Sequence, residues 1–261
     1  MKFSEKEKQI GEIIFKKFAA EKKKNQRLPL ILFNDLNKIL NVQERELLNK
    51  ILVANLKEYG KNYAEFYGIK SVPKSLVAIK NRKYFIGKNA KIVKTQFLPK
   101  PVFESFVRLN NLMKKEIGRA VNVASCYRSL AYQAIVLFNW LYQCKWNMKK
   151  ALRRVTLPGC SEHGYPSRQA VGFNRLVKEI ADIRNFYKTK EYKWVLKNAC
   201  KFGFFLSYPV GNKFGVDFES WHWHYISRAG STLCRSSLVV KHFLGKKKST
   251  SPILVSGSGE L

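Results

Sequence analysis

The chain has 261 residues, and 46% of them are hydrophobic, enough for a sizeable core in one large domain or two small ones. Lysine and arginine number 49 against 18 aspartate and glutamate residues, so the net charge is +31. This excess favours an anionic partner, or else reflects a drift in composition, because the lysines are spread along the whole chain. No arginine-rich block, RNA-binding signature or zinc-finger spacing focuses the charge, so specific nucleic-acid binding is not expected.

The cysteines and the two ends of the chain indicate where the protein is made. Five cysteines lie without close pairing and no CxxC motif occurs, which favours a reducing compartment over a disulfide framework. Residues 1–18 mix charged with apolar side chains and lack the apolar stretch of a signal peptide. No apolar run is long enough to span a membrane. We expect synthesis in the cytoplasm and a disordered tail at 246–261.

Residues 1–95 are predicted to form a small helical domain with a β-hairpin. Apolar residues recur there first at helical spacing and then in two short strand-like runs. The helices are expected at 4–19, 34–40 and 42–59, and the strands at 75–79 and 83–86. This order suits either a winged-helix-like unit or a general helical appendage. The basic stretch 88–100 has little periodicity and is predicted to be a linker.

Residues 96–245 are predicted to form a second domain. Helices cluster before and between a few strands, which is typical of the α+β class. The helices are expected at 102–117, 131–143, 171–184 and 190–202, and the strands at 121–124, 204–208 and 221–226.

The segment Glu219–Tyr225 concentrates chemically active side chains. It holds a carboxylate, two of the four histidines and two of the five tryptophans. A Glu three residues before a His, in an aromatic strand, can place a general base beside a metal ligand. Upstream, the segment Pro158–His163 ends in another isolated histidine, which suits a zinc ligand. Alternatively, each histidine is a hydrogen-bonded residue of the core.

Four short motifs of the second half carry specific side chains in a fixed order. They are Ser125-Cys126-Tyr127-Arg128-Ser129 with Gln133, Pro158-Gly159-Cys160-Ser161-Glu162-His163, Phe202–Pro209, and Glu219-Ser220-Trp221-His222-Trp223. Together they resemble the VanY-type D-alanyl-D-alanine carboxypeptidases, zinc peptidases of bacterial cell-wall metabolism related in fold to the N-terminal domain of Hedgehog proteins. The resemblance covers roughly 97–230 and implies a VanY/Hedgehog-like domain with a small, mostly antiparallel sheet flanked by helices.

The resemblance implies roles for the matching side chains. His163 and His222 match the zinc ligands. Glu219 matches the base that takes a proton from the zinc-bound water, and Arg128 matches the arginine that binds the peptide carbonyl or its developing oxyanion. The positions assigned to substrate binding are Ser125, Tyr127, Gln133, Ser161, Trp221 and His224. The alternatives are a structural salt bridge for Arg128, a place in the core or pocket wall for Trp221, and no substrate contact for His224.

The match fails at the third zinc ligand. The family continues from its first histidine through a glycine and Ala-Val to an aspartate, whereas this chain has Arg168 in place of the glycine and Gly172 in place of the aspartate. An oxygen ligand would then have to come from Asn174, Asp182 or Asp217. Otherwise two histidines and solvent hold the zinc weakly, or the metal has been lost.

The sequence therefore predicts a zinc-dependent D-alanyl-D-alanine carboxypeptidase that acts on a peptidoglycan stem peptide or muropeptide. One alternative is an impaired member of the family that binds peptidoglycan fragments without turnover. Another is a basic nucleic-acid-binding protein that uses its N-terminal helices. The substrate would be reached inside the cell, after lysis, or through an export route that the sequence does not reveal. The positive charge would favour adhesion to anionic envelope polymers.

Overall fold

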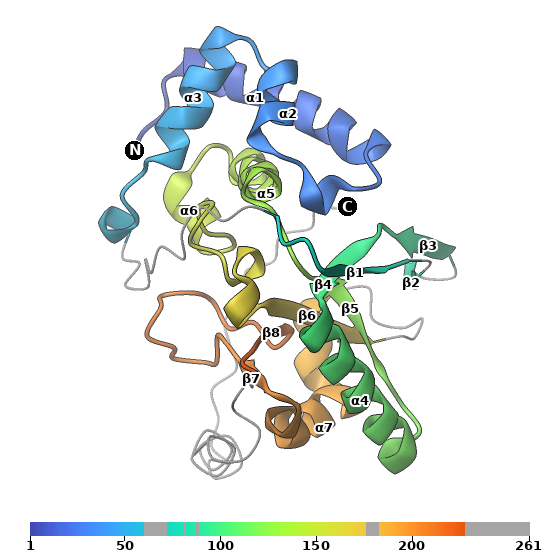
Figure 1. Cartoon of the computed structure of the whole chain (residues 1–261). Coiled ribbons are helices and arrows are strands. Elements are labelled where there is room, and N and C mark those ends of the chain that lie inside the picture. The colour runs from blue at the N-terminus through green and yellow to red at the C-terminus, as the bar shows by residue number, and fades with distance from the viewer. Residues whose placement is uncertain (60–71, 81, 87–88, 176–182, 228–261) are drawn as a thin grey trace.

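The computed structural model describes residues 1–59, 72–80, 82–86, 89–175 and 183–227 (Figure 1). The helices are α1 (Glu5–Lys24), α2 (Phe33–Ile39), α3 (Val42–Leu52), α4 (Lys100–Ile117), α5 (Leu130–Gln143), α6 (Met148–Leu152) and α7 (Lys190–Asn198). The strands are β1 (Leu76–Ile79), β2 (Arg82–Ile86), β3 (Asn89–Val93), β4 (Gln96–Pro99), β5 (Val121–Ser125), β6 (Ala170–Arg175), β7 (Phe204–Leu206) and β8 (His222–Tyr225). The protein is therefore of the α+β class.

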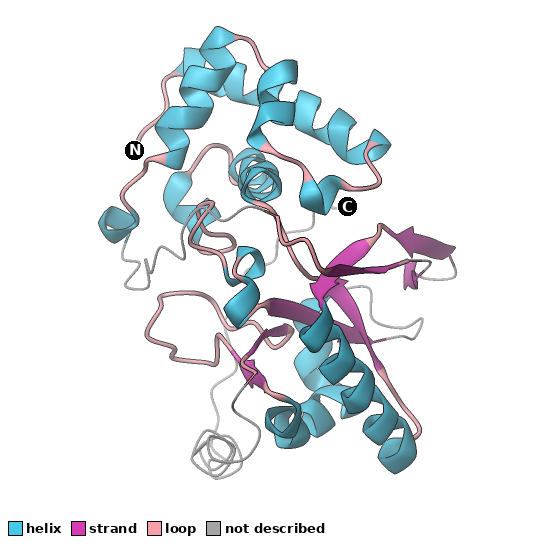
Figure 2. Ribbon diagram, in the orientation of Figure 1, coloured by secondary structure: helices cyan, strands magenta, loops and turns pink. Residues whose placement is uncertain are grey.

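A four-stranded antiparallel sheet, in the order β5-β6-β8-β7, lies at the centre of the second half (Figure 2). Helices α4 and α7 cover one of its faces. Their contact buries side chains from helix and sheet together, including Leu109, Phe173, Val195 and Phe204, each with 0% exposure. Because the sheet is pinned by this core, residues at the ends of its strands are held in fixed positions.

A second hydrophobic core lies between the N-terminal helices and α5 (Figure 1). Phe18 of α1 packs edge-to-face on Phe138 of α5, with ring centroids 5.4 Å apart. Residues on both sides of the boundary predicted at residue 95 contribute to this core, so α1–α3 and α5 stabilise one another. The boundary itself stays a prediction.

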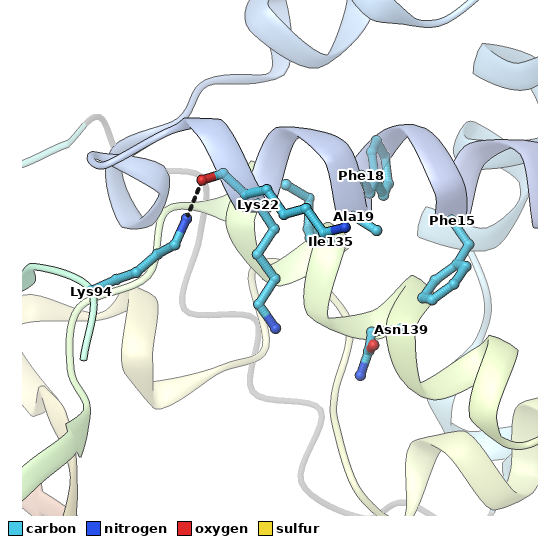
Figure 3. A pocket seen from close by; sticks show the side chains of 8 residues that line it. Phe15, Phe18, Ala19, Lys22, Lys94, Ile135 and Asn139 are labelled. Atoms are coloured by element: carbon cyan, nitrogen blue, oxygen red, sulfur yellow. Dashed lines mark hydrogen bonds between the residues drawn. The ribbon is translucent and has the colours of Figure 1, made fainter. Parts of the chain in front are cut away.

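A cavity of about 360 Å³ lies between α1 and α5, with Phe15, Phe18 and Ile135 among its apolar lining (Figure 3). Its lysines lie at the carboxyl end of α1, where cations stabilise a helix. Lys94 donates weak hydrogen bonds to the carbonyl oxygens of Lys23 (3.5 Å) and Asn25 (3.3 Å). The positive charge at this cavity thus serves to cap the helix.

Most of the predicted helices are present, but three local predictions are wrong. Strands 75–79 and 83–86 do not pair with each other: β1 pairs with β4, and β2 with β3. The stretch 88–100, predicted to be a linker, contains β3 and β4. Residues from Val171 onwards, predicted to begin a helix, form strand β6, because this buried central strand lacks the alternating pattern that marks an exposed one.

The remaining expectations concern disulfides, membrane-spanning helices and residues that the structure does not describe. Cys126, Cys144 and Cys160 are free, whereas Cys200 is disulfide-bonded, which differs from the expectation of a reducing compartment. In the part of the chain that the structure describes, no helix combines the length and apolar character needed to cross a bilayer. The predicted tail at 246–261 and Asp182 lie outside the described residues.

Candidate active site

Three neighbouring strands bring the predicted motifs together. Ser125 at the end of β5 lies opposite Gly172 of β6, and Gly172 lies opposite His222 of β8. Residues directly opposite one another in a sheet share a face, so Ser125 and His222 lie on the same face, separated by a residue with no side chain. The loop between β7 and β8 then places Glu219 beside His222, because the Glu219 amide donates to the carbonyl oxygen of Tyr208 (3.1 Å).

His163 is fixed by hydrogen bonds from both its backbone and its ring. It lies in a short 3₁₀ turn, and the Arg128 amide donates to its carbonyl oxygen (3.0 Å), which ties the arginine motif to the histidine motif. The His163 Nδ1 lies 2.7 Å from the carbonyl oxygen of Cys126, a partner that can only accept. Nδ1 therefore carries the proton, and Nε2 keeps its lone pair.

His222 lies between two carboxylates. Its Nε2 is 3.0 Å from Glu162 Oε2, and its Nδ1 is 3.3 Å from Glu219 Oε2. The rings of His163 and His222 are 4.9 Å apart at their centroids. Burial alone would lower the pKa of His222, but hydrogen bonds to and charges on Glu162 and Glu219 outweigh it and raise the pKa to about 9.

Glu162 is the centre of a buried polar network beneath this histidine. Arg168 donates to its Oε1 (2.7 Å), and the hydroxyl of Ser207 donates to its Oε2 (2.6 Å). The Ser207 oxygen in turn lies 2.8 Å from Nδ1 of His224. Burial opposes ionisation of Glu162, but the hydrogen bond and charge of His222 prevail and hold its pKa well below the usual range.

The other two histidines of the site are neutral. Burial, followed by the charges of Arg128 and His222, lowers the pKa of His163 well below its usual value. Burial also lowers the pKa of His224, to about 4, and the charge of Glu162 opposes this shift only in part. A neutral imidazole is the form that binds a metal or accepts a proton.

A cavity of about 330 Å³ opens beside His163 and His222. Arg128 and Glu219 line it with them, and the charge of Glu219 acts on the guanidinium of Arg128. The two proposed catalytic side chains and the two proposed metal ligands thus face one space, although they come from three separate segments of the chain.

Four of the predicted substrate-binding residues also line this cavity: Ser125, Gln133, Ser161 and Trp221. Tyr127 and His224 are not among the lining residues, so a substrate contact for either is not supported. Tyr127 is buried with 2% exposure, and burial raises its pKa to about 12. His224 instead supports Ser207 of the Glu162 network. Trp223 belongs to the core under the sheet.

The expected zinc is implied by the resemblance, and the side chains fit it fully at one position. The Nδ1 of His163 is tied to a carbonyl oxygen, which is the usual outer arrangement of a metal-binding histidine. His222 has a carboxylate at each ring nitrogen, Glu162 at Nε2 and Glu219 at Nδ1, so it would bind a metal only after losing a proton and releasing one of them. Within the described ranges, no group of three or more His, Cys, Asp or Glu side chains could hold a metal ion. A catalytic zinc normally has three protein ligands, so the donor set is one short.

Neither of the two alternative third ligands within the described residues fills this place. Asn174 lies two positions beyond Gly172 on β6, opposite Asn122. Asp217 pairs with Arg153, at 2.7 Å, and with Arg154, at 3.9 Å. At Gly172 itself, an added Cβ would lie 2.5 Å from Ser125 Oγ, so the serine hydroxyl occupies the space where a longer side chain would begin.

Glu162 is the main residue of the site to which the sequence assigned no role. The sequence does show that a carboxylate directly precedes His163 in the second motif, which marks Glu162 as a candidate for the site. Its adjacency to His163 gives no hint of its actual partner, because the side chain reaches His222, 60 residues away. Ser207 and Arg168 were missed for the same reason, since their contacts with Glu162 arise only in the folded chain.

Comparison with known proteins first places the chain among carboxypeptidases. It is 26% identical over 195 residues to the putative carboxypeptidase YodJ of Bacillus subtilis (strain 168), a match that spans 67% of this chain and 69% of YodJ. Its fold resembles the LdcB LD-carboxypeptidase, whose structure is described as revealing the molecular basis of peptidoglycan recognition, with a TM-score of 0.53 and 26% identity over 69% of this chain and 82% of LdcB.

The family follows from a match to the model of VanY, D-alanyl-D-alanine carboxypeptidase, over residues 95–228. The chain therefore belongs to the VanY family. A D-alanyl-D-alanine carboxypeptidase of Enterococcus faecium is 29% identical over 105 residues, which are 39% of this chain and 32% of that protein. Residues 95–228 include β5–β8 and all the residues that line the cavity beside His163 and His222.

Proposed function

We propose that this protein is a carboxypeptidase that removes a terminal D-alanine from peptidoglycan stem peptides or muropeptides. The observation that carries the proposal is the cavity in which Arg128, Glu219, His163 and His222 meet. Membership of the VanY family supports the reaction class. The likeness to LdcB, a protein described as recognising peptidoglycan, supports the substrate class.

Each of these side chains suits one part of a peptide hydrolysis. Glu219 accepts a proton on its carboxylate from the attacking water and returns it to the leaving amine. The guanidinium of Arg128 donates hydrogen bonds to the scissile carbonyl oxygen as negative charge builds there. The hydroxyls of Ser125 and Ser161, which line the cavity, would contact the substrate. A zinc ion held by His163 and His222 would supply a Lewis acid that lowers the pKa of a water molecule to about 7.

The decisive experiment measures D-alanine release from a stem pentapeptide, with zinc added and its content determined. We expect turnover by the native chain and a loss of about 100-fold or more in Glu219→Gln, because the substitution removes the proton acceptor. Glu104→Gln is the matched control, since Glu104 is exposed on α4 and does not line the cavity. Turnover that survives in Glu219→Gln would contradict the assignment of the base.

Gly172 favours a second candidate function, a domain that binds peptidoglycan peptides without cleaving them. A site that lacks one of three protein ligands binds zinc weakly, and without the metal no strong nucleophile forms at neutral pH. This alternative predicts saturable binding of the pentapeptide by the native chain together with no D-alanine release at any zinc concentration. Release of D-alanine by the native chain excludes it.

A further inference from the structure

A second arginine, Arg154, lines the same cavity as Arg128. It follows α6, and its guanidinium carbon lies 5.9 Å from the centre of the Trp140 ring, which also lines the cavity. Its side chain is 41% exposed, so the charge is accessible to a ligand that enters from solvent. The adjacent Arg153 is 63% exposed and is not among the lining residues.

The charges around Arg154 leave an excess of positive charge at this side of the cavity. Asp217 is close to both arginines, but it is held mainly by Arg153, whose Nη2 and Nε lie 2.7 Å and 3.2 Å from Oδ1. Arg154 Nε is 3.9 Å from Oδ2, the outer limit of an ion pair. One carboxylate thus faces two guanidinium groups and neutralises only one positive charge. An anionic group on a ligand would neutralise the other.

Gln133 connects Arg128 with the chain segment that follows Arg154. Its side-chain oxygen accepts a hydrogen bond from Arg128 Nη1 (3.3 Å), and its amide nitrogen donates to the carbonyl oxygen of Thr156 (2.9 Å). Thr156 lies two residues after Arg154 and lines the cavity as well. Gln133 therefore links the guanidinium of Arg128 to the backbone two residues beyond Arg154, within the wall of the same cavity.

We propose that Arg154 is a specificity-determining residue that binds a second carboxylate of the substrate. This inference rests on the proposed function, in which Arg128 acts at the scissile carbonyl. It identifies the preferred substrates as peptides that carry a free carboxylate on one of the residues preceding the scissile bond. The same peptides with that group amidated are the poorer substrates.

The test compares two D-alanine-terminated peptides that differ only in one side-chain group, a free carboxylate in one and an amide in the other. The native chain should show a KM about five-fold lower for the acid than for the amide, with similar kcat, as expected for a partly exposed ion pair. Arg154→Gln should bring the two KM values together. Lys149→Gln, at an exposed position of α6 that does not line the cavity, is the matched control and should preserve the preference.

Equilibrium binding of both peptides, measured by calorimetry, separates this inference from the proposed function. A preference for the acid that depends on Arg154 but comes without turnover overturns the carboxypeptidase proposal alone. Turnover without a preference, or a preference that survives in Arg154→Gln, overturns the role of Arg154 alone. A preference lost equally in Lys149→Gln assigns the effect to general surface charge and also overturns it.

Discussion

At the scale of single residues, Gly172 and Ser125 determine what the cavity can hold. Gly172 lies between Ser125 and His222 in the row that crosses three strands, and it offers no ligand. The Ser125 hydroxyl leans into the space above it, 2.5 Å from where a Cβ would stand. A carboxylate at 172 would lie opposite His222, but only after the serine side chain moves.

This geometry predicts that the double variant Gly172→Asp with Ser125→Ala binds zinc about ten-fold or more tightly than the native chain, because it adds a third protein ligand. Gly172→Asp alone should increase the zinc affinity less, since Ser125 Oγ must first rotate away. Ser125→Ala alone should leave the zinc affinity unchanged. Competition with a chelator at fixed pH measures the dissociation constants, and a native chain that binds zinc as tightly as the double variant would refute the explanation.

The two histidines of β8 predict a bell-shaped dependence of stability on pH for the metal-free protein. The pKa of His222 is raised to about 9, so the folded state binds more protons than the unfolded one between about 6.5 and 9. The free energy of unfolding contributed by His222 is therefore complete below pH 6.5 and is lost as the pH rises through 9. For His224 the pKa is lowered to about 4, so its contribution is lost as the pH falls from 6.5 towards 4.

We expect the midpoint of urea denaturation, measured in a chelator, to be highest near pH 6.5. His222→Gln should flatten the alkaline side of the curve. It should also change the acid side, because Glu162 loses the partner that lowers its pKa. His224→Gln should leave the alkaline side in place and make the acid side shallower, with His163 still contributing to it. An alkaline side that stays equally steep in His222→Gln would show that another group is responsible for it.

At the scale of elements, the contact of α1 with the end of α5 depends on an unusual turn. Lys145 and Trp146 both adopt the left-handed region, with φ of 51° and 59°, which non-glycine residues seldom do. This turn directs the indole of Trp146 against α1, where it meets Gly11. Trp146 also packs edge-to-face on Phe3 and Phe138.

Gly11→Ala should therefore destabilise the protein, although alanine is the better helix former by about 1 kcal/mol. An added Cβ would overlap the six-membered ring of Trp146, with Cζ3 only 2.6 Å away, and overpacking of this kind costs about 1–3 kcal/mol. Thermal denaturation measures the difference. The control Glu12→Ala, at an exposed position of the same helix, should be neutral or slightly stabilising. A Gly11→Ala variant as stable as Glu12→Ala would contradict the packing.

The helices were easier to predict from the sequence than the strands. Amphipathic helices such as α1 and α4 were predicted because their apolar spacing is a local property. Strand β6 was predicted as a helix because it is buried on both faces and therefore lacks the alternation of apolar and polar residues that marks a half-exposed strand. Its partners lie 47 or more positions away in the sequence, so no local pattern reveals the pairing. The pairing of β1 with β4 was missed for a similar reason, since a nearby strand was taken as its partner.

At the scale of the whole molecule, the N-terminal region braces the loop that carries Arg128. The Ser129 amide donates to the carbonyl oxygen of Pro29 (2.8 Å), and its hydroxyl donates to that of Ile31 (2.6 Å). The same hydroxyl accepts from the Tyr132 amide (3.1 Å) and so caps α5. None of this was predictable, because the resemblance begins near residue 97 and the motifs alone do not show what lies behind them. The meeting of Arg128, Glu219, His163 and His222 was foreseen, since the four motifs were recognised together.

The brace predicts that Ser129 is a positioning residue for the cavity. Ser129→Ala removes the cap and the bond to Ile31, and should cost about 1–2 kcal/mol of stability. At a temperature well below unfolding, it should lower kcat more than it raises KM, because Arg128 acts as charge develops on the carbonyl oxygen. Ser129→Thr, which keeps the hydroxyl, should recover most of kcat. If Ser129→Ala loses stability but keeps full kcat, the N-terminal region supports the fold without positioning Arg128.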